Sequence, residues 1–139
     1  MSFSFQKGEG AYFNGKRIHV SGVDDMKQAL LSTGFPYDLP TSPRNNINHF
    51  IDFLYRAQAV RRDGSAAMNL AYIACGRFDG HWEMKLNPWD MAAGVLLVEE
   101  AGGTVSDFKG GSFSIYGDEL LASNGLLHNR LIEILREGT

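Results

Sequence analysis

The chain has 139 residues, of which 44% are hydrophobic and 21% are charged, which is typical of a single soluble globular domain. Its net charge of -3 excludes the basic footprint of a nucleic-acid-binding surface. A signal peptide and an apolar run of about 18 residues are both absent, so we expect no membrane span and a cytoplasmic location. The single cysteine, Cys75, excludes an internal disulfide, fits a reducing compartment and is expected to be a small core residue.

The first 20 residues are expected to contain a β-hairpin. Asn14-Gly15 separates two short runs, 12–13 and 16–20, and this dipeptide is a strong hairpin signal. An isolated hairpin is only marginally stable, so these residues need a larger body to pack against.

Strands and helices are expected to alternate after this hairpin. Asp24-Asp25 predicts a short helical turn, and the segment from Pro36 to Pro43 is a predicted loop that Pro40 and Pro43 keep extended. The remaining expected strands are at 28–33 (where a helix end is the alternative), 58–62, 81–85, 104–107 and 120–123. The expected helices are at 46–57, 66–75 and 87–101, with a turn at 63–65 and a last amphipathic helix at 127–135. This alternation predicts an α/β layered fold with a mixed, largely parallel sheet.

The helix at 87–101 carries its own start and stop signals. Asn87 is a good N-cap, Pro88 suits the first helical position, and Gly102-Gly103 ends the helix. The intervening residues are apolar almost all round, which predicts a buried helix: Trp89, Met91, Ala92, Ala93, Val95, Leu96, Leu97 and Val98. In the helix at 46–57, helical spacing instead predicts one apolar stripe: Ile47, Phe50, Ile51, Leu54 and Tyr55.

Three features can meet in one site. The turn Asp63-Gly64-Ser65-Ala66 and the turn Asn87-Pro88-Trp89-Asp90 each open a helix, and backbone N–H groups at a helix N-terminus bind anions. Glu83 lies on the strand that leads to the second turn. Together they predict a site for a phosphate ester and a hard cation.

Simpler interpretations remain open at this point. Asp90 can be a capping carboxylate, Gly64-Ser65 an ordinary turn, and Glu83 a solvent-facing strand residue. The four histidines have no metal-ligand spacing and are expected at the surface, while both tryptophans are expected to pack inside: His19, His49, His81 and His128, with Trp82 and Trp89. Dinucleotide, Walker and zinc motifs are absent.

Several separated motifs resemble one family. Residues 89–94, Trp-Asp-Met-Ala-Ala-Gly, followed by Glu100-Ala101-Gly102-Gly103, resemble the second signature of the inositol monophosphatases, which are magnesium-dependent, lithium-sensitive phosphatases. Gly64-Ser65-Ala66-Ala67 followed by Glu83 also matches, as do residues 10–15 and 29–35, in the same order. The resemblance runs from about residue 8 to the end of the chain, and it implies the family's fold.

The resemblance also implies roles for individual residues. Asp90 would be a catalytic, Mg²⁺-binding carboxylate beside the attacked ester, and Glu83 would bind substrate hydroxyls. Gly64, Ser65 and Ala66 would line the pocket for a phosphorylated polyol or sugar.

One departure from the family pattern limits this expectation. The first signature, Asp-Pro-(Ile/Leu)-Asp-Gly-Thr, and the upstream Glu of the metal site do not occur in these 139 residues. The chain therefore resembles the C-terminal half of the family fold as a single domain, with residues 1–20 as the remaining hairpin of the N-terminal half and 21–139 as the C-terminal half. One Asp cannot hold Mg²⁺ strongly, so the metal site is expected to be incomplete and the isolated chain inactive.

Two functions follow from this expectation. The first is a Mg²⁺-dependent phosphomonoesterase acting on inositol phosphate or a related sugar phosphate, complete only with an N-terminal part. The second is a catalytically inactive truncated homologue that acts as a binding or assembly module, and a third option is a fragment without activity. Surfaces left uncovered by a missing half would be apolar, which predicts self-association or a partner.

Overall fold

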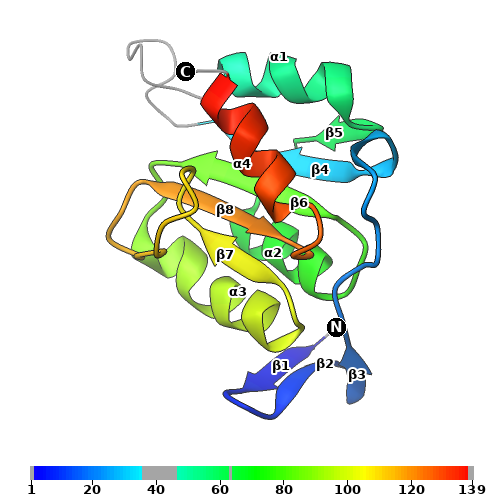
Figure 1. Cartoon of the computed structure of the whole chain (residues 1–139). Helices are drawn as coiled ribbons and strands as arrows, with labels where there is room; N and C mark the ends of the chain where they lie inside the picture. Colours follow the sequence, from blue (N-terminus) through cyan, green and yellow to red (C-terminus); the bar gives the residue numbers. More distant parts are fainter. Residues whose placement is uncertain (1, 36–46, 63, 138–139) are drawn as a thin grey trace.

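A five-stranded mixed sheet forms the centre of the computed structural model, which describes residues 2–35, 47–62 and 64–137 (Figure 1). The strands lie in the order β5-β4-β6-β8-β7: β4 (Leu30–Thr33), β5 (Ala59–Arg61), β6 (Gly80–Met84), β7 (Thr104–Ser106) and β8 (Glu119–Ser123). β4 is parallel to both β5 and β6, whereas β8 is antiparallel to both β6 and β7. Only β8 runs against the others, so the predicted α/β fold with a mixed, largely parallel sheet is confirmed.

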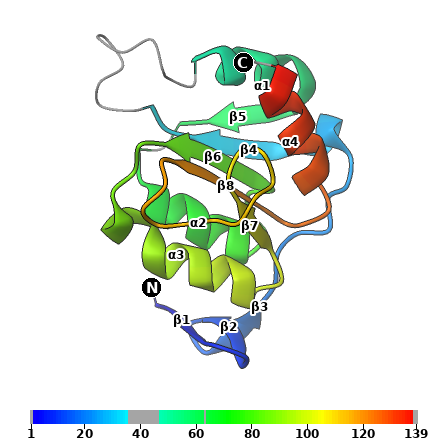
Figure 2. The same cartoon turned by 60° about the vertical axis from the view of Figure 1, so that its left-hand side comes forward.

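Helices cover both faces of this sheet (Figure 2). α1 (Ile47–Arg56) and α4 (His128–Glu137) lie on one face, and α2 (Ala66–Ala74) and α3 (Pro88–Glu100) lie on the other. Side chains alternate between the two resulting cores, as the period of a strand requires. In β8, Leu121 packs with α1 and α4, whereas Leu120 and Ala122 pack with α2 and α3.

A second, antiparallel sheet lies against the α2–α3 layer (Figure 1). Its strands are β1 (Phe3–Gln6), β2 (Gly10–Phe13) and β3 (Lys16–Ile18). Asn14 (φ 51°) and Gly15 (φ 80°) form the β2–β3 turn in the left-handed conformation that a type I′ hairpin requires, so the predicted hairpin is confirmed. β1 was not predicted. Phe3, Phe5 and Ile18 pack on the α2–α3 core, which is the body that the hairpin needs.

The amino ends of the central strands are tied together by a buried carboxylate. Asp79, which is 4% exposed, accepts a hydrogen bond from the Ser21 hydroxyl (2.5 Å) and another from the Leu30 N–H (2.7 Å). The Asn124 side-chain amide donates to Ser21 Oγ (3.0 Å) and to the Val23 carbonyl (2.7 Å). The connection that follows β3 is thereby fixed to the starts of β4 and β6 and to the end of β8.

The predicted elements all occur where the structure describes them. The short turn at Asp24-Asp25 becomes a 3₁₀ helix, η1 (Met26–Gln28), in which Asp25 accepts a hydrogen bond from Lys27 N at 3.0 Å. The strand expected at 28–33 begins only at Leu30. The predicted loop from Pro36 to Pro43 and the Asp63 position of the predicted turn lie outside the described residues. None of the helices in the described part of the chain is both long and apolar enough to span a bilayer.

The apolar stripe predicted in α1 is not its buried face, and the prediction that α3 is buried is only partly correct. In α1 most of the predicted stripe is exposed, and the helix buries Phe53 and His49 instead; the exposed members are Ile47 (41%), Ile51 (45%), Leu54 (51%) and Tyr55 (84%). α3 is not buried all round, because Trp89 (77%) and Leu96 (46%) face outward, so the prediction that Trp89 packs inside is wrong. The sheet covers only one side of each helix, so a helix with apolar residues on several sides leaves some of them uncovered.

The prediction that all four histidines lie at the surface is wrong for three of them. His19 is exposed, but His49, His81 and His128 are buried. His128 lies between two serine hydroxyls, with Nε2 2.7 Å from Ser106 Oγ and Nδ1 2.8 Å from Ser123 Oγ. Burial lowers the pKa of His128, which favours its neutral form inside the protein.

The burial of three other residues also depends on tertiary packing. His49 packs edge-on against Phe108, with 5.5 Å between ring centroids, and burial lowers its pKa although Asp52 opposes that shift. Trp82 is fully buried as predicted and packs on Phe53. Cys75 is only half-buried at the end of α2, so its assignment to the core was too strong.

Candidate active site

The carboxyl ends of β4 and β6 open into a cavity of about 510 Å³. All five candidate residues line it: Gly64, Ser65, Ala66, Glu83 and Asp90. The structure therefore brings together two turns and a strand residue that are far apart in sequence. Its other lining residues are Gly34, Phe35, Arg62, Ala67, Met84, Lys85, Leu86 and Asn87.

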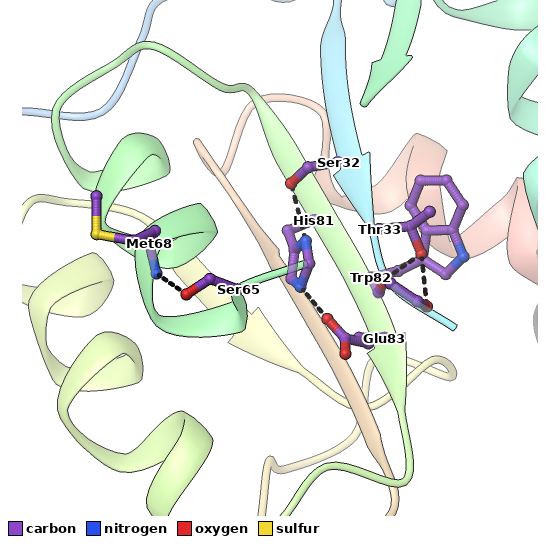
Figure 3. A network of polar contacts seen from close by, with 8 residues as sticks. Ser32, Thr33, Ser65, Met68, His81, Trp82 and Glu83 are labelled. Atoms are coloured by element: carbon purple, nitrogen blue, oxygen red, sulfur yellow. Dashed lines mark hydrogen bonds and ion pairs between the residues drawn. The ribbon is translucent and has the colours of Figure 1, made fainter. Parts of the chain in front are cut away.

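The N-termini of α2 and α3 both border this cavity. Ser65 is the N-cap of α2, and its hydroxyl oxygen accepts a hydrogen bond from Met68 N at 3.3 Å (Figure 3). Asn87 is the N-cap of α3, and Asp90 Oδ2 accepts a hydrogen bond from the Asn87 N–H at 3.2 Å. Both sets of first-turn N–H groups and both helix dipoles favour an anion in the cavity.

Glu83 is held by a chain of buried polar groups. Ser32 Oγ on β4 lies 2.8 Å from His81 Nδ1, and His81 Nε2 lies 3.0 Å from Glu83 Oε1 (Figure 3). The side chain of His81 is 0% exposed and that of Glu83 is 12% exposed. Glu83 is therefore not the solvent-facing strand residue of the simpler interpretation.

On the side away from His81, the Glu83 carboxylate lies against Gly34. A Cβ atom placed on Gly34 would lie 2.8 Å from Glu83 Cδ and 2.8 Å from Oε2. Any side chain at position 34 would displace the carboxylate or the strand end, because real Cβ contacts are not this short. Gly34 thus lets the carboxylate sit directly against the end of β4.

The carboxylates of Glu83 and Asp90 are the type of ligand that Mg²⁺ prefers, but there are too few of them to form a complete metal site. Hard oxygen donors suit Mg²⁺, and Asp90 keeps one oxygen beyond the one that caps α3. Within residues 2–35, 47–62 and 64–137, the structure contains no group of three or more His, Cys, Asp or Glu residues that could hold a metal ion.

Sequence reasoning missed several lining residues. Gly34, Phe35, Arg62 and Lys85 were not proposed, yet they line the cavity, and Arg62 lies over the Phe35 ring at 4.7 Å from its centroid. His81 was placed at the surface. Its position two residues before Glu83 was the available signal, because residues two apart in a strand share a face.

The family resemblance is confirmed by three comparisons. The family model described as the inositol monophosphatase family matches residues 1–139. The chain is 45% identical over 138 residues to the chloroplastic phosphatase IMPL1 of Arabidopsis thaliana, covering 99% of this chain and 37% of that protein. It is 44% identical over 126 residues to the inositol-1-monophosphatase of Synechocystis, covering 91% of this chain and 44% of that protein.

Solved structures agree on the fold. The inositol monophosphatase of Anabaena superposes with a TM-score of 0.95 at 43% identity, covering 97% of this chain and 54% of that one. The chain thus spans about half the length, or less, of the proteins it matches, as expected for one half of the family fold. On the match along its whole length, this chain belongs to the inositol monophosphatase family.

Proposed function

We propose that this chain forms one wall of a Mg²⁺-dependent phosphomonoesterase site that hydrolyses inositol phosphate or a related sugar phosphate. The observation that carries the proposal is that Gly64, Ser65, Glu83 and Asp90 line the same cavity at the N-termini of α2 and α3. Two helix N-termini favour a phosphate, and two carboxylates favour a metal ion and hydroxyl groups. Family membership supports the same chemistry.

Each residue has a proposed role in this site. Asp90 is the proposed catalytic residue, which would hold Mg²⁺, and Mg²⁺ would supply charge neutralisation and activation of water there. Glu83 accepts hydrogen bonds from substrate hydroxyls. Gly64, Ser65 and Ala66 line the substrate pocket, and their small side chains let the ester approach the first turn of α2.

The proposal includes a second wall that carries the first signature. In this scheme, the chain forms a single domain in which residues 21–139 correspond to the C-terminal half of the family fold and residues 1–20 to the end of its N-terminal half. The carboxylates that complete the Mg²⁺ site come from the other wall, so the chain alone is expected to be inactive. We also propose a cytoplasmic location, which the single cysteine supports.

The test is reconstitution. This chain is combined with an N-terminal segment from a family member that carries the first signature, and phosphate release from myo-inositol 1-phosphate is measured with Mg²⁺, with and without Li⁺. We expect lithium-sensitive release that is lost in Asp90→Asn. Asp107→Asn is the matched control, because Asp107 caps its own turn through the N–H groups of Lys109 and Gly111 and does not line the cavity. No release with both pieces folded would contradict the proposal.

A second candidate function is a catalytically inactive binding or assembly module. It is favoured by the exposed apolar residues on the outer sides of α1 and α3, among them Leu54, Tyr55 and Trp89. Exposed apolar patches favour association, so we expect self-association or a partner. Analytical ultracentrifugation at tens of micromolar measures this, with Leu54→Glu expected to weaken association. A clean monomer would count against it.

A further inference from the structure

In the buried hydrogen-bonded chain Ser32–His81–Glu83, each contact has a definite donor and a definite acceptor. An ionised carboxylate only accepts hydrogen bonds, so the 3.0 Å contact requires a proton on His81 Nε2. In neutral imidazole Nδ1 is then an acceptor, and the Ser32 hydroxyl at 2.8 Å donates to it. One tautomer of His81 therefore satisfies both ring nitrogens of a fully buried side chain.

This arrangement gives the two carboxylate oxygens of Glu83 different roles. Oε1 is occupied by His81, and the side chain is confined on its other side by Gly34, where a Cβ would lie within 2.9 Å of both oxygens. Glu83 itself lines the cavity, so its second oxygen is the one left for a ligand. A carboxylate held at one oxygen is a directional acceptor, whereas a free one would rotate about its last torsion.

We propose that His81 is a positioning residue: its Nε2–H holds Oε1 of Glu83, with Ser32 setting the tautomer, so that Oε2 is presented to a hydroxyl donor in the cavity. The inference deepens the proposed function, because the donor is a hydroxyl of the polyol or sugar part of the ester. His81 does not line the cavity, so it acts through Glu83 alone.

The first experiment reads the tautomer directly and needs no substrate. Two-bond ¹H–¹⁵N correlation spectra of the folded chain near neutral pH should show His81 Nε2 protonated and Nδ1 unprotonated. The exposed His19 serves as the unconstrained reference in the same spectrum. A proton on His81 Nδ1 overturns the proposal. Because no ligand is involved, this result is valid even if the phosphatase proposal fails.

The second experiment separates positioning from a purely structural role, in the reconstituted enzyme with myo-inositol 1-phosphate. His81→Phe keeps an aromatic ring but removes the donor, so KM should rise about tenfold with a smaller change in kcat, which corresponds to one oriented hydrogen bond. His81→Gln keeps an N–H near Nε2 and should stay within about threefold of the original KM.

Two further variants keep this test decisive. His128→Gln alters another histidine buried between serine hydroxyls but outside the cavity, so it should leave KM unchanged. Gly34→Ala pushes the Glu83 carboxylate from its other side without altering His81, so a raised KM in this variant shows that KM reports the position of the carboxylate. An unchanged KM in a folded His81→Phe overturns the proposal, and if that variant does not fold, the tautomer of His81 measured in the first experiment still tests it.

Discussion

Gly94 is the position where the packing of α2 against α3 can be tested most sharply. A Cβ atom on Gly94 would lie 2.6 Å from Leu70 Cδ1 and 2.9 Å from Leu70 Cβ, and Leu70 is fully buried. The Cδ1 atom can rotate away, but the Cβ atom is attached to the α2 backbone. Gly94→Ala therefore requires α2 and α3 to move apart by a few tenths of an ångström.

Two opposing terms set the expected magnitude. Alanine in place of glycine inside a helix stabilises by about 1 kcal/mol. Forcing an extra carbon into a packed core costs about 1–3 kcal/mol. The steric cost equals or exceeds the helix gain, so we expect a net loss of up to about 2 kcal/mol in the free energy of unfolding and a melting temperature lower by up to roughly 8 °C. Urea unfolding followed by far-UV circular dichroism measures the first quantity, and a thermal scan measures the second.

A double-mutant cycle isolates the contact. Leu70→Ala alone should cost about 2–5 kcal/mol because it leaves a cavity. In that background the contacts with Leu70 Cδ1 and Cγ are gone, but the Cβ atom of residue 70 stays 2.9 Å from the added methyl group, so Gly94→Ala should destabilise less than it does in the unmodified chain. The reasoning is refuted if Gly94→Ala stabilises the unmodified chain, or if it has the same effect in both backgrounds.

Three further predictions concern single sites. Asp79→Ala should destabilise by about 1–3 kcal/mol in urea unfolding, because it leaves the half-buried Leu30 N–H without its acceptor; a loss under 0.5 kcal/mol would contradict this. Burial lowers the pKa of His128, so the imidazole takes up a proton at a higher pH in the unfolded chain than in the folded one. The free energy of unfolding should therefore decrease as the pH is lowered through 6.5, and His128→Gln should reduce this decrease when unfolding is measured between pH 7.5 and 5. Gly15→Ala should cost about 1–2 kcal/mol because φ is 80° there, whereas Gly22→Ala, with no atom within 4 Å of the added Cβ, should change stability by under 0.5 kcal/mol; equal losses would refute the turn assignment.

Local sequence signals predicted the order of the elements well because each depends on neighbouring residues. Asn14-Gly15 specifies a type I′ turn through its positive φ angles, and Ser65 and Asn87 mark helix starts through their capping geometry. β1 was missed although Phe3 and Phe5 alternate with Ser4 and Gln6, which is the local pattern of a half-buried strand. Its place in the sheet is set by pairing with β2.

Burial of individual side chains could not be read from local patterns. Helical spacing identified an apolar stripe on α1, but the face that meets α4 and the sheet carries Phe53 and His49. Histidine is polar enough to be expected outside, yet His81 and His128 find serine hydroxyls that arrive from other strands. Those partners are brought close only by the folded sheet.

The sequence by itself determined the family and the alternation of strands and helices, and it supplied the candidate residues of the proposed phosphate-and-cation site, because these rest on motifs and local backbone preferences. Only the tertiary structure decided that Gly64, Ser65, Ala66, Glu83 and Asp90 line one cavity, and that Ser32 and His81 hold Glu83 in place. The reason is that parallel strands end at the same edge of a sheet, so β4 and β6 bring distant turns together there. Contacts between residues 49 positions apart in the chain exist only after that sheet has formed.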